Sequence, residues 1–102
     1  MATFKLSSLP SRYFEFEAPD NLKLLHIEPP KVKTLNRLRA WIKGNGGIDE
    51  ATVIVSIIIS KNQENRPVSP KLVAEWMTVD QLMEFVTAFH RWVYGTKEND
   101  PN

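Results

Sequence analysis

The sequence predicts an α+β, mostly helical fold, in which an N-terminal β-hairpin is followed by three to four packed helices. Residues 12–18 alternate between aromatic and acidic side chains, a period of two that is typical of a strand. After residue 30, apolar residues recur at helical spacing, and the segments are bounded by capping residues, proline or glycine. A chain of 102 residues is the size of one domain, which we assign to residues 1–95.

The predicted hairpin covers residues 12–28. Phe14 and Phe16 lie on one side of the first strand, and Glu15 and Glu17 lie on the other. Residues 19–21, Pro-Asp-Asn, have the chemistry of a tight turn. Residues 22–28 then read as the second strand. Because an isolated hairpin is only marginally stable, we expect it to pack against another part of the chain.

Residues 31–43 form the first predicted helix. Pro30 suits a helix start, and glycines at 44, 46 and 47 suit its end. The apolar positions at helical spacing are Val32, Leu35, Leu38 and Ile42, with Trp41 beside them.

The segment that follows is ambiguous. Residues 53–59 are rich in β-branched side chains, which favours a strand. The acidic start at Asp49 and Glu50, with Asp49 as N-cap, and a length of about a dozen residues favour a buried helix. We predict a helix at the centre of the core.

Two further helices are predicted. Ser69 followed by Pro70 begins a short helix over residues 70–77. Thr78 and Gln81 form a capping-box pattern that begins the last helix, which we expect to run from Val79 to about residue 94. A glycine at 95 suggests its end, and residues 96–102 are predicted to be a disordered C-terminal tail.

Composition narrows the expected class of protein. A net charge of +1 predicts no strong overall attraction to nucleic acid or acidic lipid. The longest apolar run, residues 53–59, is too short to span a bilayer, and no secretory signal opens the chain. We therefore expect a cytoplasmic protein without a membrane partner.

Catalytic and metal-binding patterns are not found in the sequence. The absence of cysteine excludes disulfides and thiolate metal ligands. His26 and His90 each stand alone in their segments, whereas zinc requires three or four converging ligands. There is no nucleophile elbow and no phosphate-binding loop. We expect no enzyme, no cofactor, and neither catalytic nor metal-binding residues.

His90 falls within the apolar stripe of the last helix. Three interpretations remain open: a hydrogen bond from its ring to a backbone carbonyl, a charged ring near the helix C-terminus, or a pH-sensitive contact at an interface.

The first predicted helix is strongly basic. It contains no acidic residue and carries five cations, Lys31, Lys33, Arg37, Arg39 and Lys43. Lys33, Arg37 and Trp41 follow one another at intervals of four, which could build a phosphate-binding face with a stacking aromatic ring. A solvated basic face is the simpler interpretation. A small nucleic-acid-binding or regulatory module that uses helix 31–43 is the alternative function. Acidic residues in the rest of the chain offset the basic excess, which argues against nucleic acid as a partner.

The last helix has an apolar arc of about half its circumference, wider than the stripe of roughly 100° that a surface helix needs. Either this helix packs on two sides within the domain, or part of the arc contacts a partner. Tryptophan and tyrosine are enriched in the hot spots of protein interfaces. The aromatic residues that we consider as candidate protein-binding residues are Trp41, Trp76, Phe85, Phe89 and Trp92.

Three segments resemble a known family: residues 29–38 (PPKVKTLNRL), 68–77 (VSPKLVAEWM) and 78–86 (TVDQLMEFV). Their pattern and order over residues 22–94 are similar to those of the small tail assembly chaperones of tailed bacteriophages and prophages. That family has a similar proline-proline-basic helix start and a C-terminal Glu-Trp-Leu followed by a capped amphipathic helix.

The resemblance implies a non-catalytic assembly factor that works in the cytoplasm of a bacterial host. Such a chaperone shields the long helical tape-measure protein, and the tail tube protein is a second possible partner. An amphipathic surface can cover the apolar stripe of such a client through helix-in-groove contacts, without a cofactor.

Overall fold

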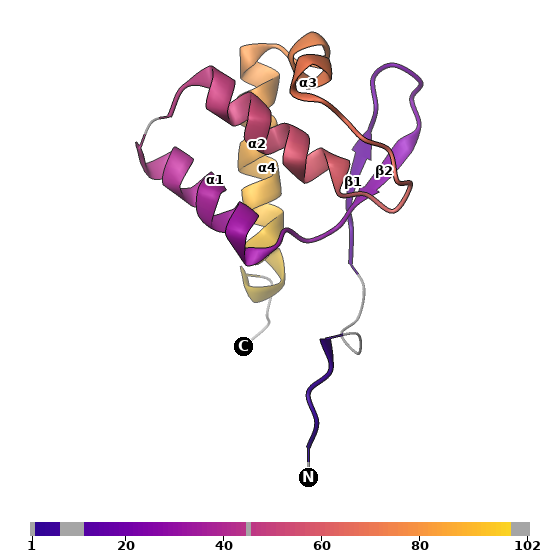
Figure 1. The fold of residues 1–102 in the computed structure, drawn as a ribbon, viewed down its shortest axis with the longest axis vertical. Helices are drawn as coiled ribbons and strands as arrows, with labels where there is room; N and C mark the ends of the chain where they lie inside the picture. Colours follow the sequence, from indigo (N-terminus) through magenta and orange to yellow (C-terminus); the bar gives the residue numbers. More distant parts are fainter. Residues whose placement is uncertain (1, 7–11, 45, 99–102) are drawn as a thin grey trace.

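The computed structural model describes residues 2–6, 12–44 and 46–98. Within them the chain forms an antiparallel hairpin followed by four helices, so the predicted α+β, mostly helical fold is confirmed (Figure 1). The elements are β1 (Phe14–Glu17), β2 (Leu24–Ile27), α1 (Val32–Gly44), α2 (Ile48–Ser60), α3 (Pro70–Trp76) and α4 (Val79–Glu98).

The hairpin pairs Phe14 with Ile27 and Phe16 with Leu25. The second strand begins at residue 24, two residues later than predicted, because Leu22 adopts a left-handed backbone conformation (φ 57°) that belongs to the turn. The outer edge of β2 is covered by the segment after α2. The N–H of Glu28 donates to the carbonyl of residue 61 at 2.9 Å, and the N–H of Gln63 donates to the carbonyl of residue 26 at 3.0 Å.

Helix α2 is the centre of the core, as the sequence predicted for residues 53–59. Its buried apolar residues are Ala51, Ile54, Val55, Ile58 and Ile59. The prediction that Asp49 caps this helix is wrong. Gly47 occupies the N-cap, and Asp49 and Glu50 lie in the first turn, where a negative charge still favours the positive end of the helix dipole.

The caps of the last two helices are formed as predicted. The N–H of Leu72 donates to the Ser69 hydroxyl at 3.1 Å, and Thr78 and Gln81 exchange reciprocal hydrogen bonds of 2.9 and 3.1 Å. The expected helix end near residue 94 is wrong, because α4 continues through Gly95 to Glu98. None of the described glycines has the positive φ that commonly ends a helix. The other residues of the predicted tail, 99–102, lie outside the described residues.

Aromatic rings join the hairpin to α4. The Phe14 ring centroid lies 5.4 to 5.7 Å from those of Phe85, Phe89 and Trp92. Arg12, just before β1, donates to the carbonyls of Trp92 and residue 93 at 3.1 and 2.9 Å. Its guanidinium also lies over the indole ring of Trp92, 4.3 Å from the centroid. The hairpin is therefore fixed to the C-terminal helix by both packing and hydrogen bonds.

Candidate protein-binding groove

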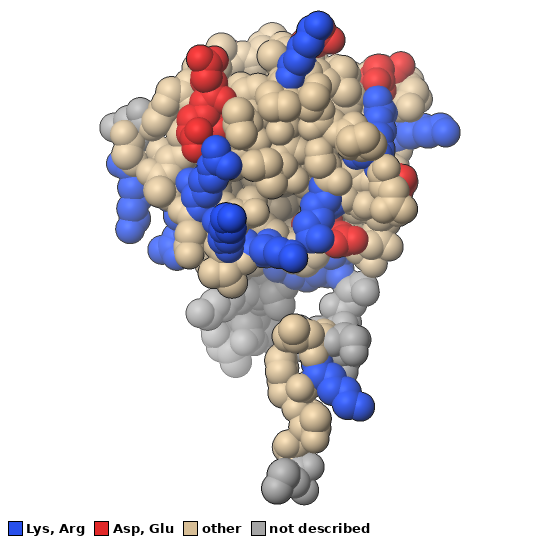
Figure 2. Space-filling view, in the orientation of Figure 1, with Lys and Arg blue, Asp and Glu red and all other residues tan. Residues whose placement is uncertain are grey.

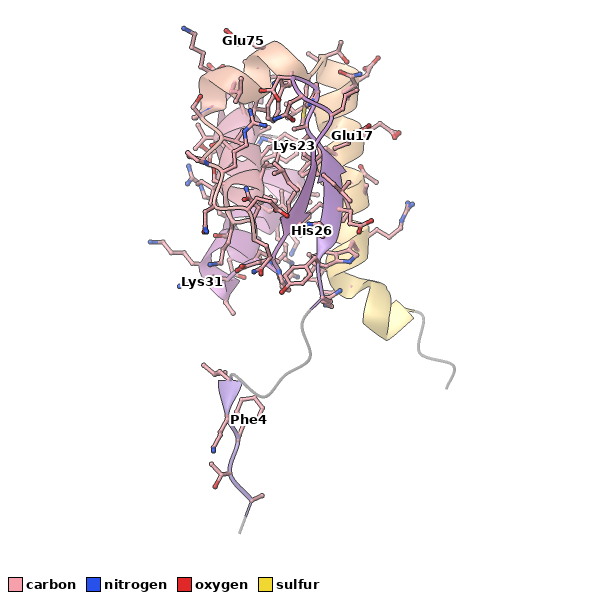
Figure 3. The ribbon with its side chains drawn as sticks, turned by 90° about the vertical axis from the view of Figure 1, so that its right-hand side faces the viewer. Phe4, Glu17, Lys23, His26, Lys31 and Glu75 are labelled. Carbon is pink, nitrogen blue, oxygen red and sulfur yellow. The ribbon has the colours of Figure 1, made fainter. Side chains whose placement is uncertain are left out.

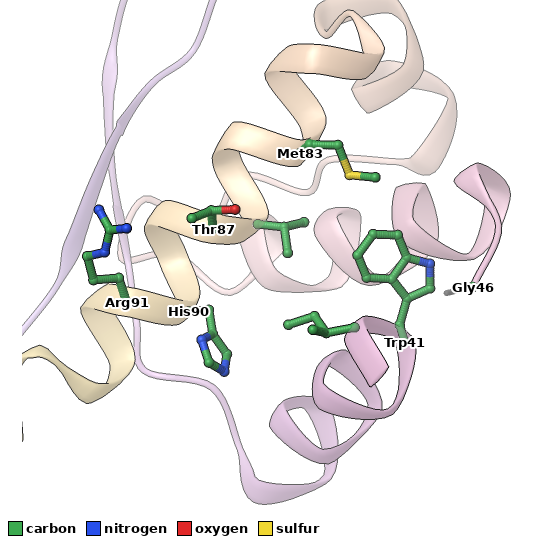
Figure 4. Close-up of a pocket in the computed structure, with 8 residues that line it drawn as sticks. Trp41, Gly46, Met83, Thr87, His90 and Arg91 are labelled. Carbon is green, nitrogen blue, oxygen red and sulfur yellow. The ribbon is translucent and has the colours of Figure 1, made fainter. Parts of the chain in front are cut away.

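A groove separates the C-terminal end of α1 from the middle of α4, two helices that both pack on α2 (Figure 4). Its volume is about 660 Å³. The residues that line it are Trp41, Ile42 and Gly46 from the α1 side, and Met83, Val86, Thr87, His90 and Arg91 from α4.

Trp41 forms one wall of the groove and faces Met83 across it (Figure 4). The indole Nε1–H donates to the carbonyl of Gly47 at 3.0 Å, and the N–H of Gly46 donates to the carbonyl of Trp41 at 3.2 Å. A Cβ atom on Gly46 would overlap the indole ring, so the ring lies directly on the glycine backbone. The short connection after α1 therefore fixes the orientation of this wall.

The opposite wall is formed by α4 and combines an exposed with a buried apolar side chain. Met83 is 39% exposed and Val86 is buried, while on the α1 side Ile42 is 40% exposed. Thr87 and Arg91 are exposed at the side of the groove. The arrangement offers apolar surface between two helices, with polar groups at the rim.

His90 is half-buried in this wall, and its ring lies edge-on to Tyr94 with the centroids 5.0 Å apart. No hydrogen bond of its ring is found in the described part of the chain. The helix continues for eight residues beyond it, so His90 is not at the helix C-terminus. The structure thus lends no support to the first two interpretations offered by the sequence, and it places the ring at a surface groove.

Positive charge gathers on α1 (Figure 2, lower left). Segment 31–43 holds five basic and no acidic residues, whereas the rest of the chain holds eight basic and twelve acidic residues. Arg37 donates from Nε to Glu50 at 2.9 Å; this hydrogen bond lowers the pKa of Glu50 and raises that of Arg37. In the described residues, the other four cations of segment 31–43 form no ion pair.

The five aromatic candidates from the sequence do not form one surface. Phe89 is fully buried and Phe85 is 8% exposed, so both are core residues, as the internal-packing interpretation predicts. Trp92 is half-buried between Phe89 and the hairpin. Trp76 is half-buried between the Arg66 guanidinium and Phe16 of β1. Only Trp41 among the five lines the groove.

The groove residues that the sequence analysis missed are mainly Ile42, Met83 and Thr87. Met83, Thr87 and His90 follow one another at intervals of four and three, so they share one helical face. The sequence therefore predicts that these three residues share a face. It does not predict that this face points towards α1 and away from the core, because that depends on the tertiary packing.

The proposed nucleic-acid face is only partly assembled. Lys33 is exposed, but Arg37 is held by Glu50, and Trp41 turns towards the groove with its indole N–H already donating. Lys33, Arg37 and Trp41 therefore do not present three available groups on one surface.

The part of the chain that the structure describes shows neither a metal-binding cluster nor a membrane-spanning helix. In residues 2–6, 12–44 and 46–98, no cluster of three or more histidine and carboxylate side chains is placed to hold a metal ion. Among the helices in these ranges, none has the length and apolar character to cross a membrane. No protein-family model, no curated protein and no solved structure matches the chain.

Proposed function

We propose that this protein is a non-catalytic binding factor whose groove between α1 and α4 receives the apolar face of a partner helix. The observation that carries the proposal is the pairing of exposed Ile42 and Met83 across a hollow walled by Trp41. Helix-in-groove recognition uses this arrangement, because the partner buries apolar side chains spaced three and four residues apart.

The indole of Trp41 gives the groove a rigid wall. Its N–H is already satisfied within the chain, so a partner can cover the ring without leaving a buried donor unpaired. Tryptophan side chains of this kind are enriched at the energetic centres of protein interfaces. Arg91 at the rim and the cations of α1 favour a helix that carries acidic residues beside its apolar stripe.

We further propose that the partner is the tape-measure protein of a phage or prophage tail, with the tail tube protein as a second possible partner. The resemblance of residues 22–94 to tail assembly chaperones supports this step. A tape-measure helix exposes its apolar stripe until tube subunits cover it, and a groove of this kind shields such a stripe. The protein would then act in the bacterial cytoplasm.

The test compares two substitutions at equally exposed apolar positions. Met83→Glu places a charge in the groove, whereas Ile57→Glu places one on α2, outside the groove, at a residue that is also 39% exposed. Both variants and the original protein are used as bait in extracts of the native source, and the recovered proteins are identified by mass spectrometry. We expect a long, helix-rich phage protein with the original chain and with Ile57→Glu, but not with Met83→Glu.

Two results would contradict the proposal. If Met83→Glu recovers the same partner as Ile57→Glu, the groove is not the binding surface. If the original protein recovers nucleic acid that is lost at high salt and in a Lys33→Gln, Arg37→Gln variant, with no protein partner, the basic helix α1 is the functional surface.

A further inference from the structure

Strand β1 has an open edge. The N–H and carbonyl of His26 on β2 point away from β1, towards Glu64 and Gln63, and the N–H of Glu28 just after β2 points towards residue 61. Because residues directly opposite each other in an antiparallel ladder point the same way, inwards or outwards, Glu15 opposite residue 26 also points its peptide groups outwards. Glu17 does the same, two residues later. Within the described residues, the backbone groups of Glu15 and Glu17 have no hydrogen-bond partner.

An apolar hollow of about 400 Å³ adjoins β1, between the hairpin, α3 and the first half of α4. The rings of Phe16, Trp76 and Phe85 line it; the Phe16 centroid lies 6.0 Å from that of Trp76 and 5.6 Å from that of Phe85. Ala88 on α4 contributes a small, exposed side chain to the same hollow. The hollow thus extends the inner, aromatic face of the hairpin towards solvent.

Residues 2–6 carry the pattern that fits this edge. Phe4 is 74% exposed and Leu6 is 80% exposed, and the segment 2–6 lies apart from the body of the molecule (Figures 1 and 3). Lys5 stands between them in the sequence and carries the charge opposite to that of Glu15 and Glu17. In an extended conformation, Phe4 and Leu6 point to one face and Lys5 points to the other.

We propose that residues 2–6 of one copy of this chain add as a strand to the open edge of β1 in a second copy. Phe4 enters the hollow beside Phe16, and Leu6 lies on the same inner face. Lys5 falls on the outer face with Glu15 and Glu17. The backbone contacts supply the pairing, and the alternation of side chains selects the register.

The charges of the edge make this pairing selective. Two glutamates on an exposed edge strand disfavour pairing with an acidic strand, and they disfavour β1 pairing with another β1. A strand with a lysine between two apolar residues fits this edge, because the lysine neutralises the glutamates on the outer face and the apolar residues cover the inner face. The same two glutamates would therefore repel unrelated strands and accept residues 2–6.

The experiment measures self-association by sedimentation equilibrium of the full chain. Phe4→Ser removes the side chain that fills the hollow, and Ala88→Glu obstructs the hollow. We expect each to weaken self-association about 10- to 100-fold, because one large apolar side chain is no longer buried. Thr87→Glu is the matched control, since Thr87 lines the groove on the other side of α4. It should leave self-association unchanged.

Mixing the two variants tests whether the contact passes between copies. Phe4→Ser retains an intact hollow and Ala88→Glu retains an intact N-terminal segment, so an equimolar mixture should associate more strongly than either variant alone. Hydrogen exchange provides a second readout. The backbone amides of Glu15 and Glu17 should become protected when the original chain associates, and they should stay unprotected in Phe4→Ser at the same concentration. Circular dichroism confirms that each variant is folded.

Three outcomes would overturn the proposal: a monomeric original chain at millimolar concentration, self-association insensitive to both variants, or a monomer in which Phe4 contacts its own Trp76. Recovery of a partner by Ala88→Glu and not by Thr87→Glu would separate this surface from the groove between α1 and α4.

Discussion

The carboxylate of Glu64 binds both the backbone and the side chain of His26, a residue 38 positions earlier. Oε1 accepts the His26 backbone N–H at 2.8 Å, and Oε2 lies 2.6 Å from Nδ1 of the ring. A carboxylate only accepts, so Nδ1 carries the proton in this contact. The pair joins the outer edge of β2 to the loop that follows α2.

The first prediction concerns the acid stability of that pair. Hydrogen bonds from His26 lower the pKa of Glu64 in the folded protein. The ionised carboxylate therefore stabilises the fold fully at pH values above the ordinary glutamate pKa of about 4.3. This stabilisation is lost as the pH falls from that range through the lowered value in the folded protein. When the pH is lowered from about 5 to about 3, the free energy of unfolding of Glu64→Gln should therefore fall less than that of the original chain. Urea unfolding at each pH measures the difference, and equal slopes for the two proteins would refute the assignment.

The second prediction concerns Asn62, a buried polar residue that is 5% exposed. Its Nδ2 donates to the carbonyls of Ile59 and Arg66 at 2.7 and 2.8 Å, and its Oδ1 accepts the N–H of Arg66 at 2.9 Å. Asn62→Ala leaves several of these groups unpaired, at about 1–3 kcal/mol for each buried group. We expect a loss of roughly 2–4 kcal/mol in chemical unfolding. A loss below about 0.5 kcal/mol would show that water replaces the amide.

The third prediction distinguishes core from surface aromatic residues. Phe89→Ala removes a fully buried ring that packs on Phe14 and Trp92, and should reduce the free energy of unfolding by about 3–5 kcal/mol. Phe4→Ala, at a residue that is 74% exposed, should change the stability of the isolated monomer by less than about 0.5 kcal/mol. Equal effects in dilute urea titrations would contradict the assignment of Phe89 to the core.

The fourth prediction concerns the wall of the groove. Gly46→Ala introduces a Cβ that overlaps the Trp41 ring, so the indole must move and its hydrogen bond to Gly47 must break. Gly47→Ala is the matched control, because a Cβ there meets no atom within 4 Å. The Trp41 indole N–H resonance should shift in the first variant and remain in place in the second. An unchanged resonance in both would show that the ring does not lie on Gly46.

Capping chemistry allowed much of the fold to be predicted from the sequence. Ser69, Thr78 and Gln81 bond the backbone of their own helix starts, so their roles depend on a few neighbouring residues. The alternation of aromatic and acidic side chains in β1 can likewise be read from four consecutive residues. The helix ends were less predictable, because Gly95 terminates a helix only where the backbone turns left-handed, and here it does not.

The candidate site was harder to predict than the fold. Met83 belongs to the apolar arc of α4 in the sequence, and nothing local distinguishes it from buried Val86. Their difference in exposure, 39% against 4%, arises from the position of α1, which leaves one face of α4 uncovered. Likewise, the sequence leaves open whether Phe85 and Phe89 pack within the domain or contact a partner, and only the position of the hairpin decides for internal packing.

The hydrogen bonds between β2 and residues 61–64 also have a consequence for biosynthesis. The hairpin leaves the ribosome before the four helices, yet its outer edge is closed by a segment made after α2, and its aromatic face is covered by α4. Translation at about 5–20 residues per second therefore exposes an unfinished sheet for several seconds before α4 emerges. The hairpin is therefore made before the segments that cover it, and it reaches its native packing only after α4 has emerged from the ribosome.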